Sequence, residues 1–371
     1  MMTARRTAVA HAAWLAALLC LSIIVSAGIG PVYIEPINVL KVILNAVSIP
    51  VGVAVSSDQV SIGSSVLQIP AMNIVWGAPF SFATDRVHEQ IVIGVRLPRI
   101  LLAAAVGFAL ATAGTVMQGF FRNPMADPSI IGVSSGAAVG AVAFIVAPAM
   151  IPFGMGLRGA AFVGAVVTAF VVYMIATEGG KTPVATLLLA GIAIQAFLGS
   201  VITFLQLYSG ESLRQVVHWL MGHFGNARWG DVGITFVLVP LLFLIILAYG
   251  RDLNVLLLGE ADAKGLGVEV ERTKKILLVL SSVITAAAVA VSGIIGFVGL
   301  IVPHMVRLIV GPDHRILLPT AALAGGSFLV ITDTIARTAL GASDIPVGIV
   351  TAALGAPFFI YLLVSREVHS L

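Results

Sequence analysis

Charged residues are scarce in this sequence. Aspartate, glutamate, lysine and arginine make up only 10% of its 371 residues, whereas a soluble domain carries about 25%. Too few charges are present to cover a surface that faces water, which excludes a soluble globular protein. The net charge of +3 is too small and too scattered for a surface that binds nucleic acid.

Groups suited to chemistry are scarce as well. The single cysteine, Cys20, excludes an intrachain disulfide and a metal site with several cysteines. His218 and His223 flank Trp219, but their spacing does not put them on one helical face, and we interpret them as loop histidines rather than metal ligands. No arrangement of acid, base and nucleophile is recognisable. We therefore predict neither an enzyme nor a metal or cofactor bound by this chain.

Apolar residues and glycine are abundant instead. Hydrophobic residues reach 59%, glycine contributes 38 residues and the mean hydropathy is +1.09. Uncharged runs of about 20 residues can cross a bilayer as helices, and these runs are too continuous for the strands of a membrane β-barrel. The sequence therefore predicts an all-α membrane protein.

Nine apolar runs can be counted, and the seventh is too long for one level span. Gly293, Gly296, Gly299 and Pro303 interrupt it, so we predict two helices joined at a glycine hinge, and ten transmembrane helices in all. The runs cover residues 12–32, 100–121, 128–157, 159–177, 182–210, 232–250, 276–306, 316–332 and 345–365.

The placement of lysine and arginine supports ten helices rather than nine. With ten, most basic loop residues fall on one side, as expected for cytoplasmic loops, and Arg337 falls outside. Both termini are then cytoplasmic and the segment 32–90 is extracytoplasmic. In that segment Leu40, Ile43, Leu44 and Val47 have the spacing of a surface helix, and the remainder is expected to be a variable excursion.

Two kinds of energy source can be weighed from the sequence. The apolar runs hold almost no ionisable side chain, which weakens a proton-coupled carrier because such carriers keep ionisable groups in the membrane. Gly179, Gly180, Lys181 and Thr182 resemble the end of a phosphate-binding loop, but Ile175 stands where that motif needs glycine. If ATP drives this protein, another chain must bind it.

Three segments are more polar or richer in glycine than membrane packing requires. In the first, Arg96 and Arg99 share a helical face around Pro98. The second, 257–268, is a cytoplasmic stretch of helix formers in which two glycines can end a short helix suited to a partner's groove. The third, 292–307, is the glycine hinge followed by a helix end that contains proline.

Together these segments resemble the FecCD/BtuC-type permease subunits of bacterial and archaeal ABC importers for cobalamin, iron-siderophores or haem. The resemblance runs from about residue 96 to the C-terminus and implies the type II importer architecture, with ten helices per subunit. One polytopic domain, 1–371, would then hold a first helix and a long outer loop in 1–90 and the permease core in 91–371. The long outer loop departs from the family's shorter connection.

The resemblance also implies partners. These are a second copy of the chain, two ATPase subunits that use ATP and magnesium, and an extracytoplasmic substrate-binding protein, all at the lipid bilayer of the cell membrane. Carried over by position, the resemblance implies three sets of functional residues. They are Arg96, Arg99 and Arg337 for docking the binding protein; Glu260, Ala261, Asp262, Ala263, Gly265, Leu266 and Gly267 for coupling to the ATPase; and Thr182, Pro183 and Thr186 for an inner gate.

The resemblance covers permeases for more than one cargo. Segments 118–140 and 219–229 look most similar to corrinoid permeases, which favours cobalamin. A ferric siderophore or haem is the alternative. A proton-coupled secondary transporter and a structural membrane subunit without a transport role also remain open.

Overall fold

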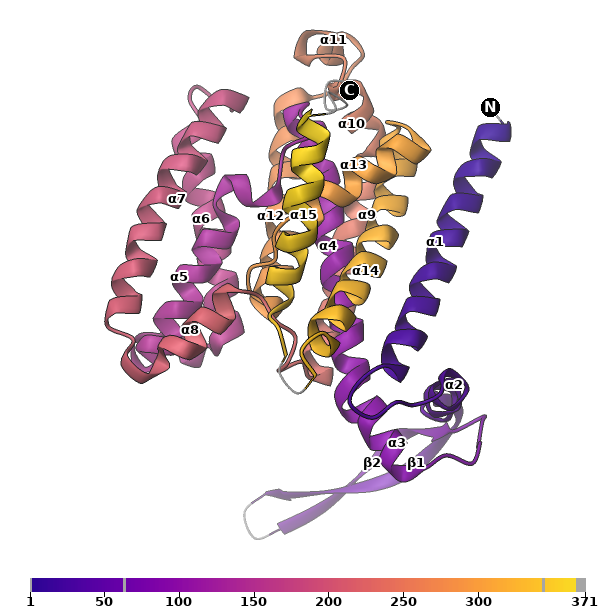
Figure 1. Cartoon of the computed structure of the whole chain (residues 1–371). Coiled ribbons are helices and arrows are strands. Elements are labelled where there is room, and N and C mark those ends of the chain that lie inside the picture. Colours follow the sequence, from indigo (N-terminus) through magenta and orange to yellow (C-terminus); the bar gives the residue numbers. More distant parts are fainter. Residues whose placement is uncertain (1, 63–64, 342–343, 365–371) are drawn as a thin grey trace.

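The chain folds into a helical bundle that carries a β-hairpin at one end (Figure 1). The computed structural model describes residues 2–62, 65–341 and 344–364. Seven helices in this part of the chain are long and apolar enough to cross a membrane. They are α1 (Met2–Gly28), the helix Arg86–Phe121 that ends in α4 (Leu97–Phe121), α6 (Leu157–Ala176), α7 (Val184–Leu207), α9 (Trp229–Ala248), α12 (Val270–Ser292) and α14 (His314–Thr338).

Shorter helices complete the bundle. Three of them, α5 (Val133–Val146), α13 (Val298–Val310) and α15 (Val347–Val364), overlap predicted spans, so a helix corresponds to each of the ten predicted spans. Because the apolar stretches of these three helices are only 10–17 residues long, the count of ten crossings stays a prediction. The remaining short helices are α2 (Pro36–Asn45), α3 (Arg86–Glu89), α8 (Leu213–Leu220), α10 (Gly250–Leu256) and α11 (Glu260–Gly265).

Most helices differ from the predicted runs by several residues at one end or both, and two spans differ more markedly. The run 128–157 yields only α5, because Pro128, Pro148 and Pro152 begin short 3₁₀ turns on either side of it. The second helix begins at Arg86, well before the predicted start at residue 100. It passes through a π-helical stretch, Gln90–Arg96, where the Leu97 amide donates to the Val92 carbonyl. This wider turn precedes Pro98, which has no N–H to offer its own helix.

The predicted glycine hinge is confirmed. Helix α12 ends at Ser292 and α13 begins at Val298, so the seventh apolar run forms two helices. Gly293 has a φ of +73°, a left-handed conformation that L side chains rarely adopt. A β-carbon on it would lie 2.2 Å from the Trp219 carbonyl oxygen. The hinge therefore depends on glycine both for its backbone conformation and for its packing.

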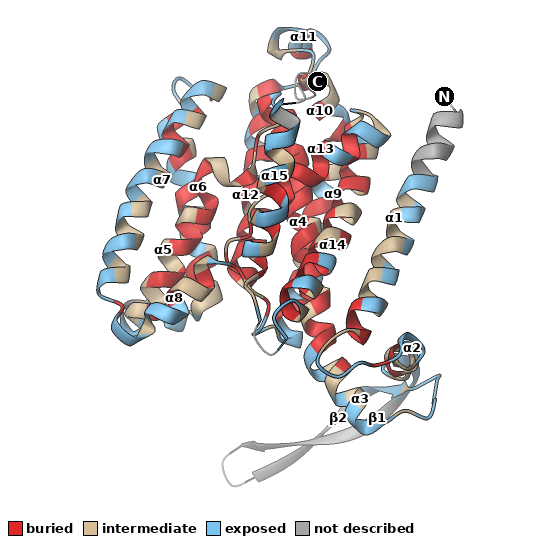
Figure 2. Cartoon of the chain, viewed as in Figure 1, coloured by how far each residue is buried: buried red, intermediate tan, exposed pale blue. Residues whose placement is uncertain are grey.

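Helix α4 is the centre of the bundle and is buried along most of its length (Figure 2). Glycines allow its backbone to approach two neighbours closely. A β-carbon on Gly107 would lie 2.2 Å from the Gly325 carbonyl oxygen in α14, and one on Gly114 would lie 1.9 Å from the Gly299 carbonyl oxygen in α13. Small residues at such contacts are what hold membrane helices together, because lipid supplies no hydrophobic drive between them.

The outer segment contains structure that the sequence analysis did not predict. Strands β1 (Ile49–Ile62) and β2 (Ser65–Gly77) form an antiparallel hairpin in which Ile49 pairs with Gly77. The helix predicted before it is present as α2, but its buried face is set by Val39 and Val42. Leu40 remains exposed. The helix packs on α1 and on the π-helical stretch. Contacts with protein, rather than with a lipid surface, therefore determine which of its faces is buried.

The two ends of the bundle carry different elements. The hairpin and α8 lie at one end, named here the hairpin end, and α11 lies at the opposite end, named here the α11 end (Figure 1). Helix α1 begins and α15 finishes toward the α11 end. The start of α1, the end of α15 and α11 therefore lie at one end of the bundle, as in the predicted topology, where both termini are on the same side as the segment 257–268.

Candidate functional site

Arg96 and Arg337 bind backbone carbonyls at the end of α1. The Arg96 guanidinium donates to the carbonyl oxygens of Ala27 at 2.7 Å, Gly28 at 3.2 Å and Val32 at 2.5 Å. Arg337 donates to the carbonyls of Ser26 and Ile29 and to the Ser26 hydroxyl. The last carbonyls of a helix lack partners within the helix and carry partial negative charge, so two cations suit this place.

Arg99 makes a different set of contacts at the same end of the bundle. Its guanidinium binds both carboxylate oxygens of Asp333, at 2.9 and 3.1 Å, and one oxygen of Asp344 at 2.5 Å. The Asp333 side chain is only 1% exposed, whereas that of Asp344 is 55% exposed. Arg99 is thus held between a buried acid and an accessible one.

These contacts bear on the predicted docking role of the three arginines. The structure brings Arg96, Arg99 and Arg337 together at the hairpin end, as the prediction requires. However, Arg96 and Arg337 are buried and their guanidinium groups already bind backbone oxygens. Their contacts give both residues a structural role in holding the end of α1, and docking by the set stays a prediction. Asp344, the accessible partner of Arg99, was missed because it is distant from Arg99 in the sequence.

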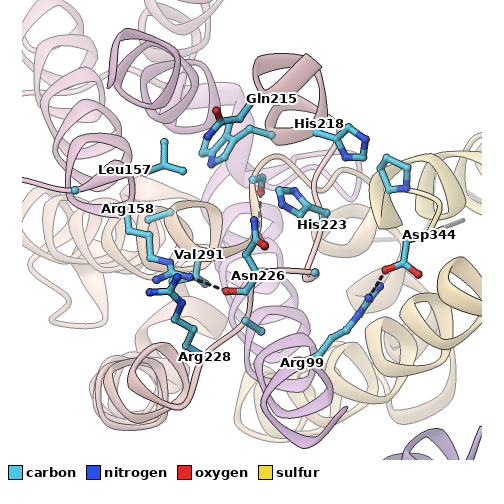
Figure 3. A pocket seen from close by; sticks show the side chains of 18 of the residues that line it. Arg99, Leu157, Arg158, Gln215, His218, His223, Asn226, Arg228, Val291 and Asp344 are labelled. Atoms are coloured by element: carbon cyan, nitrogen blue, oxygen red, sulfur yellow. Dashed lines mark hydrogen bonds and ion pairs between the residues drawn. The ribbon is translucent and has the colours of Figure 1, made fainter. Parts of the chain in front are cut away.

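A cavity of about 1090 Å³ opens beside this cluster (Figure 3). It lies between α8, the segment 223–228, the start of α6 and the segment 344–346. Besides Arg99, its wall carries Arg158, Arg214 and Arg228. Arg158 is paired with Asp231 at 2.5 Å, while Arg214 and Arg228 form no ion pair with any acid among the described residues. The acids Glu211 and Asp344 line the same wall, so the cavity has a wall of mixed charge in which Arg214 and Arg228 are the arginines without an ion pair.

Of the two histidines interpreted as loop residues, only His223 lies in a loop, because His218 is in the last turn of α8. The two face each other in this cavity. The rings of His218 and His223 meet edge to face, with centroids 6.0 Å apart. Helical spacing does not predict this approach, because the chain turns at Gly222, φ +68°, just after α8 ends. Burial, together with the charge of His218, lowers the pKa of His223. No group of three side chains able to hold a metal occurs in the described part of the chain.

The α11 end carries the second predicted set. Helix α11 follows Gly259, whose φ of +116° only glycine adopts readily. Ala263 is the buried residue of this helix, while Asp262 and Leu266 are exposed, Leu266 by 63%. The other predicted coupling residues, Glu260, Ala261, Gly265 and Gly267, lie in or directly after the same helix.

A groove of about 540 Å³ lies beside α11. Leu266 and Gly267 line it together with Arg251, Asp252 and Arg272. An exposed leucine next to a charged groove is suited to a protein partner, because it offers an apolar anchor inside a polar rim. The structure therefore presents α11 as an accessible projection of the bundle.

The predicted gate residues lie at the same end, where α7 begins. Thr182 is buried and its hydroxyl lies 2.9 Å from that of Thr177, whereas Pro183 and Thr186 are exposed. Lys274, which the sequence analysis did not single out, donates to the Thr182 carbonyl at 2.9 Å and to Glu260 at 3.0 Å. It thereby connects the predicted gate with the predicted coupling helix. The sequence does not reveal this connection, because the gate and the coupling helix are far apart along the chain.

Comparison with known proteins gives a family for this geometry. Residues 18–365 match the model of the FecCD transport family. The chain is 52% identical to the cobalamin import system permease protein BtuC of Halobacterium salinarum, over 373 aligned positions that cover 100% of both chains. It is 41% identical to the hemin transport system permease protein HmuU of Yersinia pestis, over 80% of this chain and 90% of that one.

A solved structure agrees with the sequence matches. One described as an inward-facing conformation of a metal-chelate type ABC transporter superposes with a TM-score of 0.73 and 32% identity, covering 95% of this chain and 98% of the other. The arrangement of helices, and not only the sequence, is therefore that of this class of transporter. The chain belongs to the FecCD transport family and is a membrane-embedded permease subunit of an ABC importer.

Proposed function

We propose that this permease carries cobalamin into the cell. The observation that supports this cargo most strongly is the 52% identity to a cobalamin permease over the full length of both chains, including the outer segment that holds the hairpin. The haem permease matches a smaller share of this chain at lower identity. Full-length agreement favours a shared cargo because, in the proposed orientation, the outer segment faces the side from which a ligand arrives in an importer.

In this proposal the chain is passive and other subunits supply the energy. Two copies form the pathway, a binding protein delivers cargo at the hairpin end, and ATPase subunits that use ATP and magnesium dock on α11. The exposed Leu266 and its neighbouring groove support docking at α11. At the opposite end, the partner of Arg99 is the exposed carboxylate of Asp344. Arg99 can exchange this partner for an acidic residue of a binding protein. The hairpin end then faces outward and both termini face the cytoplasm.

The cavity at the hairpin end is the proposed vestibule for cargo. Its volume of about 1090 Å³ exceeds the upper end of the range of about 300–1,000 Å³ typical of sites for drug-sized ligands, which suits a large chelate. The unpaired Arg214 and Arg228 favour a second candidate function, the import of an anionic chelate. Haem with its carboxylates and many ferric siderophores belong to that class.

A competition experiment separates the two candidates. The chain is reconstituted in proteoliposomes with its ATPase and binding protein, and ATP-dependent uptake of labelled cyanocobalamin is measured against excess haemin or a ferric hydroxamate. The proposal predicts saturable cobalamin uptake that neither competitor reduces. Uptake of haemin or ferric chelate without cobalamin uptake would instead establish the second candidate. In that case Arg214→Gln with Arg228→Gln should weaken uptake.

A further inference from the structure

Lys274 is buried at the α11 end and connects three elements. It lies in the first turns of α12, and its side chain is only 6% exposed. Its ammonium group donates to the Glu260 carboxylate in α11 at 3.0 Å and to the Thr182 carbonyl before α7 at 2.9 Å. Glu271, on the same face of α12, lies 3.8 Å away.

The backbone of Thr182 is held from both sides by α12. Its carbonyl accepts from Lys274, and its amide donates to the Glu271 carboxylate at 3.2 Å. The preceding turn is tight: Gly179 and Gly180 both have positive φ, and Glu178 pairs with Lys181 through backbone hydrogen bonds. Because both the amide and the carbonyl of Thr182 are bound by α12, a movement of the Lys274 or Glu271 side chain should move this turn.

Helix α11 has few other attachments near this turn. It packs chiefly on α10 and α12, and most of its side chains are exposed. In the described part of the chain, the contact of the Lys274 ammonium with the Glu260 carboxylate is the one hydrogen bond between an α11 side chain and the rest of the bundle. Burying a lysine ammonium costs free energy unless it is paired. Loss of either Glu260 or the Thr182 carbonyl as a partner of Lys274 is therefore unfavourable.

We propose that Lys274 is a positioning residue that transmits movement of α11 to the α6–α7 turn. This inference rests on the proposed function, in which an ATPase moves α11. When α11 shifts, Glu260 draws the Lys274 ammonium with it or releases it to Glu271. Either change alters the hold on the Thr182 carbonyl, and α7 begins two residues later. No covalent step is involved, and Lys274 contacts neither cargo nor nucleotide.

The first test measures the link in the permease alone. Spin labels are placed at Asp262→Cys on α11 and Glu178→Cys on the turn, both exposed positions, in a Cys20→Ala background that removes the only native thiol. Distances between the labels are measured in lipid nanodiscs. We expect a narrow distribution in this parent, a broadened one in Lys274→Met and in Glu260→Gln, and a narrow one again in Lys274→Arg.

The second test measures transport per ATP hydrolysed in the assembled importer. Lys274→Met should lower this ratio by about tenfold, a typical strength for coupling between two sites, while the ATPase still co-purifies and hydrolyses ATP. Lys274→Arg should restore the ratio. The matched control is Lys275→Met, which removes the neighbouring lysine on the exposed face of α12. Its ammonium lies over the Tyr173 ring of α6 and does not bind the Thr182 carbonyl, so this variant should keep the parental ratio.

The outcomes separate this inference from the proposed function. Parental label distances, or a parental transport ratio, in a folded Lys274→Met variant would overturn the role of Lys274. An equal effect of Lys275→Met would also overturn it, because a nonspecific loss of positive charge would then explain the result. If the parent importer shows no ATP-dependent uptake, the proposed function fails, and the distance comparison still decides whether Lys274 joins α11 to the turn.

Discussion

Replacing Asp333 with alanine should destabilise the hairpin end by about 3 kcal/mol, near the low end of the cost of removing one partner from a buried ion pair. Asp333 is 1% exposed, binds the Arg99 guanidinium through both oxygens, and lies 3.9 Å from Arg337. Its loss leaves two cations without their shared acid. We take the low end because Arg99 keeps its contact with Asp344.

Asp344→Ala is the matched control, because it removes the other carboxylate from the same arginine. Asp344 is 55% exposed, and ion pairs open to solvent contribute only about 0–1 kcal/mol. Hydrogen exchange at the ends of α4 and α14 is a suitable assay, since it reports local opening without assuming two-state unfolding of a membrane protein. Asp333→Ala should raise exchange there about a hundredfold, which corresponds to about 3 kcal/mol. Equal exchange in the two variants would refute the reasoning.

Three further predictions follow from other parts of the bundle. Gly114→Ala should lower stability by about 1–3 kcal/mol in thermal unfolding, because the added carbon meets the Gly299 carbonyl; Gly233→Ala, where nothing lies within 4 Å, should not. Because the pKa of His223 is lowered in the folded state, its contribution to stability is present above the unfolded pKa of about 6.5 and is lost as the pH falls through the lower folded value. The Tm of the parent should therefore drop on acidification more than that of His223→Gln, and parallel pH curves would contradict this. Gly265→Pro should reduce recovery of the ATPase in a pull-down, because it removes a backbone donor at the end of α11, and undiminished recovery would count against docking there.

Much of the helical architecture could be predicted because lipid imposes simple rules. Uncharged runs located every long helix, and the glycines at the end of α12 correctly predicted the break before α13. Helix limits were less predictable. The start at Arg86 lies among charged residues, and prolines around α5 shortened a run that hydropathy alone reads as continuous.

The hairpin was missed for a different physical reason. Its strands project from the bundle (Figure 1), so they lie outside the packed helices that lipid rules predict. Ile49, Val51, Val53 and Val55 alternate with small residues, which is the strand pattern that could have identified β1. Pro50 and Gly52 interrupt that pattern with residues that weaken a strand.

The site could be predicted by region but not by contact. The sequence analysis grouped Arg96, Arg99 and Arg337 correctly at one end, because topology alone determines the side of each loop. It could not show that two of them bind carbonyls of α1, since a guanidinium suits a backbone oxygen as well as a carboxylate. Lys274 was missed because its partners come from distant segments and only the fold brings them together.

The central claim is that this chain is a conduit that depends on separate ATPase subunits for energy. Its most direct test is the accumulation of labelled cobalamin in proteoliposomes that contain the chain with its ATPase and binding protein, compared with proteoliposomes that contain the chain alone. We predict accumulation against a gradient only when all subunits and hydrolysable ATP are present, and no effect of collapsing the proton gradient. Accumulation by the chain alone, or its loss when the proton gradient is dissipated while ATP remains, would contradict the account.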